Sequence, residues 1–268
     1  MSVSNHRGTM AEQTDVTACV LVIGNEILSG RTQDKNINFL AKGLNEIGVR
    51  LREVRVIPDI RETIIATVNE CRQAFDYVIT TGGIGPTHDD ITSECIAEAF
   101  GVGMYRDPDV VALLQSYMTS GDLNEARLRM ATFPDGAELI QNPVSAAPGY
   151  RVDNVFVLAG VPQIMQAMFE GSRHLLAGGD PMLSRAVSVM LAEGAIAEGL
   201  GDLQARYPDI DIGSYPAMRR RRFGVSVVLR GTDANRLDTA LTELKKLLVD
   251  LGGEPEDESP DDPPGGDD

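Results

Sequence analysis

The stretch from Tyr77 to Phe100, YVITTGGIGPTHDDITSECIAEAF, constrains the fold more than any other part of this sequence. A short apolar strand runs into a glycine-rich loop, and an amphipathic helix follows the loop. Glycine has no Cβ atom and adopts positive φ, so the N–H groups of such a loop can turn toward an anion, and the helix N-terminus adds partial positive charge. We therefore expect a phosphate to bind the loop residues Gly82, Gly83, Gly85, Pro86 and Thr87.

Two adjacent carboxylates, Asp89 and Asp90, lie at the end of this loop. They would repel a bare phosphate, so the pattern predicts a divalent cation such as Mg²⁺ between them and the ligand. Two simpler explanations stay open: Asp90 is also a good N-cap for the following helix, and glycines after a strand can form an ordinary turn. We favour phosphate and metal, because the glycines, Thr87 and both acids lie between one strand and one helix.

Strands and helices alternate on both sides of the loop. Apolar runs predict strands over residues 18–24, 49–57, 77–81 and 155–158, with amphipathic helices between the first three. This order implies right-handed crossovers and a mostly parallel sheet, in which ligands bind beyond the carboxyl ends of the strands. Asn25 and Glu26 follow the first strand. We expect Asn25 to contact the ligand, and Glu26 to join Asp89 and Asp90 as catalytic residues and metal ligands.

Several polar positions have an ordinary explanation beside the functional one. Glu26 could be a solvated loop acid, and Asp34 could cap its own helix. Asn142 and Ser145 lie in a loop of small residues and are expected to face the same cleft as ligand contacts. That loop taken alone is more typical of a hairpin connection.

The sequence predicts two folded domains. Residues 18–171 form the first, and the boundary falls at 171–179, where apolar periodicity lapses and AGGDP follows. Residues 180–252 show the order strand-helix-strand-strand-helix, which is typical of a small two-layer α+β domain. Residues 1–17 are expected to be flexible, and the acidic tail over 253–268 is expected to be disordered. The arginine run 219–222 is more typical of a solvated turn than of a phosphate site.

Charge and cysteine content narrow the class of partner. Half of the net charge of -16 comes from the acidic residues between Glu254 and Asp268, and the rest of the chain shows no basic stripe. This argues against nucleic acid or an anionic membrane as a partner. No run of about 18 apolar residues indicates a membrane span. Cys19, Cys71 and Cys95 lie in apolar patterns without a CxxC pair, as expected of reduced core residues in a cytoplasmic protein.

Four motifs occur together in this chain: IGNEILSGRTQDKN, TTGGIGPTHDDIT, NPVSAAPG and LAGVP. With them, residues 18–171 resemble the molybdopterin-binding domain family, and within it the competence/damage-inducible protein A (CinA-like) branch and the N-terminal domain of eukaryotic FAD synthases. The resemblance implies a three-layer α/β/α fold with a cleft for a phosphorylated pterin or nucleotide. It also implies divalent-metal-dependent hydrolysis of dinucleotide pyrophosphates such as ADP-ribose or FAD, and a tendency to form homo-oligomers.

The resemblance also assigns residues. The family's glycine loop falls on Gly82, Gly83 and Gly85, its acidic loop residue on Asp90 beside Asp89, and its first-strand polar pair on Asn25 and Glu26. The chain departs from the family at Ser145, where relatives often carry glycine. No C-terminal amidohydrolase domain follows, so nicotinamide-mononucleotide deamidase activity is not expected. Three functions stay open: hydrolysis of a dinucleotide pyrophosphate, which we favour, adenylylation of molybdopterin in molybdenum-cofactor biosynthesis, and pterin or nucleotide binding without turnover.

Overall fold

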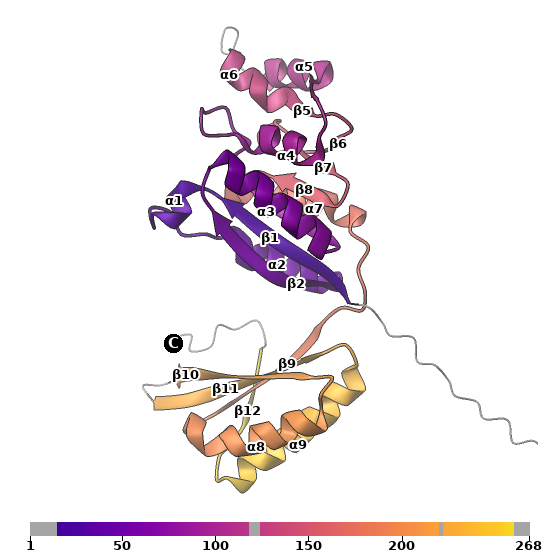
Figure 1. Cartoon of the computed structure of the whole chain (residues 1–268). Helices are drawn as coiled ribbons and strands as arrows, with labels where there is room; N and C mark the ends of the chain where they lie inside the picture. The colour runs from indigo at the N-terminus through magenta and orange to yellow at the C-terminus, as the bar shows by residue number, and fades with distance from the viewer. Residues whose placement is uncertain (1–14, 118–123, 220–221, 260–268) are drawn as a thin grey trace, which may run out of the picture. The chain divides into compact units, whose positions relative to one another are not determined.

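The computed structural model of the chain describes residues 15–117, 124–219 and 222–259. The chain divides into two compact units, whose boundary lies between Gly179 and Asp180. Figure 1 draws the first unit in indigo to salmon and the second in orange to yellow. In the described parts of the chain, no helix is both long enough and apolar enough to cross a membrane.

The first unit is built on a six-stranded sheet with the strand order β2-β1-β3-β8-β7-β6. Its strands are β1 (Val16–Ile23), β2 (Val49–Ile57), β3 (Tyr77–Thr81), β6 (Glu138–Ile140), β7 (Gly149–Val152) and β8 (Val155–Leu158). The neighbours β2, β1, β3 and β8 are parallel, and β7 and β6 add two antiparallel strands at one edge. The predicted, mostly parallel sheet is confirmed.

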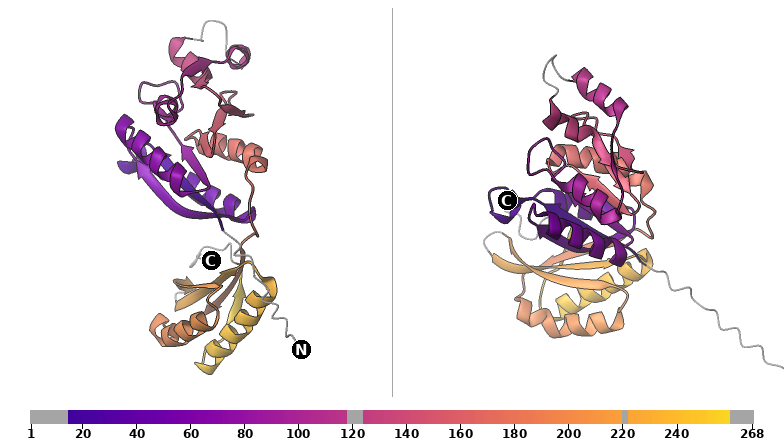
Figure 2. Two further views of the ribbon diagram at one scale, coloured as in Figure 1. Left: turned by 45° about the vertical axis from the view of Figure 1, so that its right-hand side comes forward. Right: turned by 45° about the horizontal axis from the view of Figure 1, so that its top comes forward.

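Helices cover both faces of this sheet, because successive side chains of a strand point to opposite faces. The odd-numbered residues 19–23 of β1 share a core with α3 (Arg61–Ala74) and α4 (Thr92–Phe100). The even-numbered residues 18–22 share a second core with α2 (Asn36–Glu46) and α7 (Pro162–Ser172). The two further views in Figure 2 show the sheet between these helical layers. The predicted three-layer α/β/α fold is confirmed.

Shorter elements complete the first unit. They are α1 (Asn25–Leu28), β4 (Met104–Arg106), α5 (Pro108–Tyr117), α6 (Glu125–Leu128), β5 (Thr132–Pro134) and two 3₁₀ turns, Arg129–Ala131 and Arg173–Leu175. The strands β4 and β5 pair antiparallel, and β5 packs against α4. This brings the 3₁₀ turn before β5 close to the start of α4, which is where the glycine-rich loop ends.

The second unit is a four-stranded antiparallel sheet in the order β10-β11-β9-β12. Its elements are β9 (Leu183–Val189), α8 (Glu193–Arg206), β10 (Asp211–Arg219), β11 (Arg222–Gly231), α9 (Ala234–Asp250) and β12 (Glu256–Glu258). Apolar side chains of β9 and β11 form one core with α8 and α9. The arginine run 219–222 lies partly outside the described residues.

The structure corrects the predicted disorder of the acidic tail. Residues 256–258 form a strand that pairs with the edge of β9. The carboxylate of Asp257 lies 2.6 Å from Lys245 Nζ, and Ser226 donates a 2.5 Å hydrogen bond to Glu258. Main-chain pairing at a free sheet edge needs no apolar side chains. The prediction of disorder relied on the low hydrophobicity of this segment and therefore missed the strand. At the other end of the chain, β1 begins at Val16, inside the segment predicted to be flexible. Residues 1–14 and 260–268 lie outside the described chain.

Candidate functional site

The glycine-rich loop begins where the carboxyl ends of β1, β3 and β8 meet. Gly82 has φ 103°, and a Cβ atom there would collide with the carbonyl oxygen of Ile23. A Cβ atom at Gly160, after β8, would lie 3.2 Å from the Cα of Gly82. The N–H of Gly82 donates to Leu158 O at 3.1 Å, so this N–H belongs to the sheet. The sequence predicts that the N–H groups of this loop turn toward an anion, but that of Gly82 forms a hydrogen bond within the sheet instead.

The two loop carboxylates converge on one hydroxyl group. Thr87 Oγ1 lies 2.5 Å from Asp89 Oδ1 and 2.5 Å from Asp90 Oδ2, and the N–H of Thr87 donates to Asp90 Oδ2 at 2.8 Å. A hydroxyl carries a single proton, so it can donate to one carboxylate only. A Cβ atom at position 85 would lie 2.6 Å from Asp90 Oδ2, so glycine at this position lets the carboxylate rest against the loop.

Asp90 does not cap the following helix. The N-cap of α4 is Ile91, without a side-chain cap, and the Asp90 carboxylate bonds back to Thr87 instead. The structural alternative raised for Asp90 is therefore wrong. The hydrogen bond from Thr87 holds the pKa of Asp89 below its ordinary value. Asp89 is therefore ionised at neutral pH.

Arg129 fixes the far side of the loop, and the sequence analysis missed it. Its guanidinium donates to the main-chain carbonyl oxygens of Thr87, at 3.1 Å, and of Asp90, at 2.9 Å. It also lies 3.5 Å from Glu94 in α4. A single arginine in a 3₁₀ turn carries no motif, so only the fold reveals this contact.

Asp59 is a second residue at this edge of the sheet that was not among the predicted site residues. Its carboxylate accepts a 2.8 Å hydrogen bond from the N–H of Asn25, the first residue after the β1 end. Asp59 follows β2, the parallel neighbour of β1. Its place directly after a predicted strand was the available signal, because carboxyl ends of parallel strands lie at one edge of a sheet.

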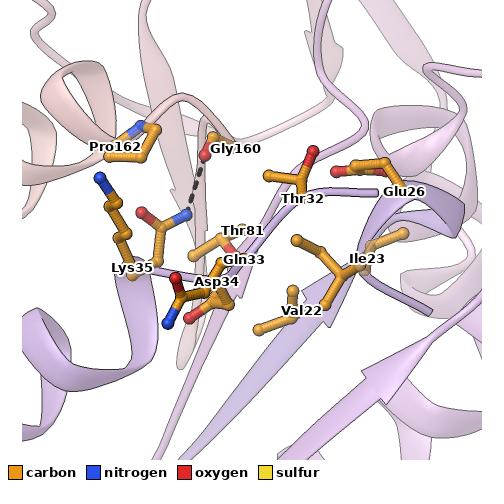
Figure 3. A pocket seen from close by; sticks show the side chains of 12 residues that line it. Val22, Ile23, Glu26, Thr32, Gln33, Asp34, Lys35, Thr81, Gly160 and Pro162 are labelled. Atoms are coloured by element: carbon orange, nitrogen blue, oxygen red, sulfur yellow. Dashed lines mark hydrogen bonds between the residues drawn. The ribbon is translucent and has the colours of Figure 1, made fainter. Parts of the chain in front are cut away.

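A small open pocket lies on the α2 and α7 side of the same edge. Figure 3 shows side chains from the end of β1, from Thr81, from the segment before α2 and from the turn before α7 around it. The pocket is lined by Val22, Ile23, Glu26, Ile27, Thr32, Gln33, Asp34, Lys35, Asn36, Thr81, Gly160 and Pro162. Asn36 donates from Nδ2 to Gly160 O at 2.9 Å (Figure 3). Asp34 Oδ1 accepts from the N–H of Ile37 at 2.8 Å, so Asp34 binds the first turn of α2 from the residue before the N-cap, which is Lys35.

The loop with Asn142 and Ser145 is held together by its own hydrogen bonds. Nδ2 of Asn142 donates to Ser145 Oγ at 2.6 Å and to Ala147 O at 2.8 Å. Its Oδ1 accepts from the N–H groups of Val144 and Ser145. These four bonds use the whole hydrogen-bonding capacity of the carboxamide. The geometry gives Asn142 a structural role in the connection between the antiparallel strands β6 and β7.

Both units of the chain match known protein families. Residues 19–177 match the family model described as a probable molybdopterin binding domain. The chain belongs to the molybdopterin-binding domain family. Residues 181–252 match a second family model, the middle domain of FAD synthase.

Individual relatives of this molybdopterin-binding domain protein agree with the assignment. A protein of Archaeoglobus fulgidus is 33% identical over 231 residues, which cover 86% of this chain and 97% of that protein. A probable FAD synthase of Caenorhabditis elegans is 31% identical over 259 residues, covering 87% of this chain and 50% of the relative, so the chain spans half the length of that enzyme. The crystal structure of the protein CinA from Thermoplasma acidophilum is 34% identical with a TM-score of 0.57, and covers 60% of this chain and 98% of that chain. The predicted family and its CinA-like branch are confirmed.

In this molybdopterin-binding domain, the three acids predicted to bind metal divide between two places. Glu26 lines the pocket, whereas Asp89 and Asp90 face Thr87 in the loop. Within residues 15–117, 124–219 and 222–259, no group of three or more His, Cys, Asp or Glu side chains could hold a metal ion. Mg²⁺ in nucleotide sites is often bound by one or two carboxylates together with substrate phosphates. Asp89 and Asp90 supply two carboxylates of this kind. The hydroxyl of Thr87 has one proton and can donate it to only one of them.

Proposed function

We propose that this molybdopterin-binding domain protein is a metal-dependent hydrolase of a dinucleotide pyrophosphate of the ADP-ribose or FAD type. The observation that carries the proposal is the 2.5 Å approach of Thr87 Oγ1 to both Asp89 and Asp90. Two carboxylate oxygens thus converge on Thr87, whose hydroxyl proton can serve only one of them while its N–H donates to Asp90 Oδ2, and such a pair of carboxylates suits a hard cation. The similarity of residues 181–252 to the middle domain of FAD synthase supports a dinucleotide such as FAD.

Each residue of the loop would have a distinct role. Asp89 and Asp90 would hold a divalent cation, which when bound neutralises diphosphate charge and lowers the pKa of a coordinated water. Asp89 is a carboxylate at neutral pH, and the hydrogen bond from Thr87 lowers its pKa further, so it would bind the cation in its charged form. The N-terminus of α4 favours negative charge at the loop. Arg129 positions the loop by binding its carbonyl oxygens and would not touch the substrate.

The reaction balances without a further reactant. Water attacks one phosphorus, the bridging P–O bond breaks, and each product keeps one phosphate. FAD would give FMN and AMP, and ADP-ribose would give AMP and ribose 5-phosphate. The water oxygen adds to one phosphate, and the bridging oxygen leaves with the other.

Incubation of the purified protein with FAD or ADP-ribose and Mg²⁺, Mn²⁺ or Co²⁺ tests this function. We expect mononucleotides to appear, and Asp90→Ala to reduce their formation at least about a hundredfold, in the range found for removal of one charge-stabilising group. Glu98→Gln, on the exposed side of α4 where Glu98 pairs with Arg61, is the control and should react at the wild-type rate. Intact dinucleotides with every metal would refute the hydrolase.

A second function is favoured by the family match itself, whose description names molybdopterin. The protein would then bind or adenylylate molybdopterin in molybdenum-cofactor biosynthesis, and ATP would be consumed only when the pterin is present. A binding module without turnover would instead show thermal stabilisation by the ligand and no product. In that case Asp90→Ala would weaken binding and change no reaction rate.

We also infer a cytoplasmic protein that acts on a small phosphorylated ligand, without nucleic acid or membrane partners, and that forms homo-oligomers. Cys19, Cys71 and Cys95 are free and buried, as expected of a reducing compartment. Light scattering coupled to size-exclusion chromatography would test the oligomer, and a mass equal to one chain would contradict it.

A further inference from the structure

Two buried polar atoms of residues that line the pocket lack a partner within the described chain. Asn36 is 4% exposed and Thr81 is 1% exposed, and both line the pocket. Among the residues that the structure describes, neither Asn36 Oδ1 nor Thr81 Oγ1 has a hydrogen-bond partner. The orientation of the Asn36 carboxamide is set by Gly160, whose carbonyl oxygen can only face Nδ2. The free atom of Asn36 is therefore an acceptor.

Unpartnered groups of this kind are rare in folded proteins. A buried acceptor that lacks a donor destabilises the folded state, and nearly all buried polar atoms are paired. For an unpaired group of a pocket-lining residue, a bound ligand would supply the missing hydrogen-bond partner. The ligand must then offer a donor to Asn36 Oδ1 and a donor or acceptor to the hydroxyl of Thr81.

The other residues that line the pocket indicate what kind of ligand would fit it. Val22, Ile23, Ile27 and Pro162 provide apolar walls, which suit the face of an aromatic ring. The charged residues at the pocket are two carboxylates, Glu26 and Asp34, and one ammonium group, Lys35. Their net negative charge disfavours a bare phosphate and tolerates a neutral ring.

The pocket lies next to the start of the acid-bearing loop. Thr81, a pocket residue, directly precedes Gly82, from which the chain runs to Asp89 and Asp90. Gly160 lines the pocket and packs against Gly82. A ligand with its ring in the pocket would have its remaining atoms near Gly82, at the start of that loop.

We propose that this pocket binds the heterocyclic ring of the ligand, and that Asn36 and Thr81 recognise a ring edge with an N–H donor beside an acceptor. Asn36 Oδ1 accepts from the ring N–H, and Thr81 donates to the neighbouring ring oxygen or nitrogen. Flavin, pterin and adenine rings all present such an edge. This inference rests on the proposed function for the identity of the ligand class and adds the subsite that reads its ring.

The strand itself offers a matched pair of variants. Thr80 and Thr81 are both buried, and in the described part of the chain both hydroxyl groups lack a partner. Alternation along β3 places Thr80 on the α3 and α4 face, away from the pocket. Thr80→Val and Thr81→Val each remove one unpaired hydroxyl from a similar shape, so neither should lower the free energy of unfolding.

Binding of FMN, AMP and pterin-6-carboxylate is measured by calorimetric titration without metal, with ribose 5-phosphate as the probe that lacks a ring. We expect Thr81→Val to weaken binding of at least one ring-bearing probe about tenfold, as for one lost hydrogen bond. Thr80→Val should bind as the wild type does, and Thr81→Ser, which keeps the hydroxyl, should restore affinity. The probe that responds identifies which ring the pocket takes.

The inference is overturned if Thr81→Val leaves the affinity of every probe unchanged, if no ring-bearing probe binds, or if ribose 5-phosphate binds equally well and responds equally. Water alone would then fill the pocket. None of these probes contains a pyrophosphate bond, so the titrations do not depend on hydrolysis. Thr81-dependent binding of FMN together with intact FAD after incubation would refute the hydrolase and keep the ring pocket.

Discussion

The guanidinium of Arg129 lies 2.9 Å from the main-chain carbonyl oxygen of Asp90. A second hydrogen bond, of 3.1 Å, joins the same guanidinium to the carbonyl oxygen of Thr87. One side chain from a 3₁₀ turn thus fixes both ends of the segment that carries the two acids. The direction of those acids therefore depends on how the β4–β5 region packs against α4.

Arg129→Ala should loosen this loop. Arg129 is 34% exposed, so the loss in free energy of unfolding should be about 1 to 2 kcal/mol rather than the full value of two buried charged hydrogen bonds. Urea unfolding measures it. Arg106→Ala removes an ion pair with Glu125, whose side chain is 82% exposed. It should lower the free energy of unfolding by about 0.5 kcal/mol or less. Equal losses in the two variants would contradict a special role for Arg129.

Gly83→Ala and Gly101→Ala separate backbone strain from steric collision. Their φ angles are 69° and 67°, so alanine is strained at both. At Gly101 a Cβ atom meets nothing within 4 Å among the described residues, whereas at Gly83 it would collide with the buried side chain of Thr92. We expect Gly101→Ala to cost about 1 to 2 kcal/mol and Gly83→Ala about 1 to 3 kcal/mol more. Chemical denaturation of both variants checks this, and a similar cost for each would argue against the close packing at Gly83.

Thr87→Val should raise the pKa of Asp89. The hydroxyl of Thr87 is the main reason that this pKa is depressed in the folded state. A depressed folded pKa means that the contribution of Asp89 to stability is complete above the unfolded pKa, and is lost as pH falls through the folded pKa. NMR titration of the carboxyl carbon should show the pKa of Asp89 moving up toward its ordinary value. Thr239→Val, on the exposed face of α9, serves as the control. If the pKa of Asp89 does not change in Thr87→Val, the hydroxyl of Thr87 is not what lowers it.

The three thiols should be inert in the folded protein. Burial raises the pKa of Cys19 and Cys71, and raises the pKa of Cys95 to about 11. Only the thiolate is an effective nucleophile. Native protein at pH 8 should therefore react slowly with a chromogenic disulfide reagent, and all three thiols should react promptly in urea. Rapid reaction of a thiol without denaturant would show that one of these sites opens easily.

Local patterns predicted the central elements of the fold well. The strands β2, β3 and β8 have the limits expected from their apolar runs, because each run is bounded by polar or turn-forming residues. The same patterns failed at β12, where main-chain pairing and contacts with Lys245 and Ser226 hold an acidic segment. They also left open whether Asp90 caps the following helix, and the structure shows that its carboxylate binds Thr87 in its own loop instead.

The sequence by itself determined the mostly parallel sheet, the second α+β unit, and the loop that carries glycines and two acids, because strand period, helix period and glycine spacing are properties of neighbouring residues. Only the tertiary structure decided that Glu26 lines a pocket while Asp89 and Asp90 share Thr87, and that Arg129 clamps their loop. It also revealed that Asn36 and Thr81 leave polar atoms unpaired at the pocket wall, within the part of the chain that the structure describes. These relationships join segments distant along the chain, and their geometry follows from how the ends of parallel strands pack, which no local pattern encodes.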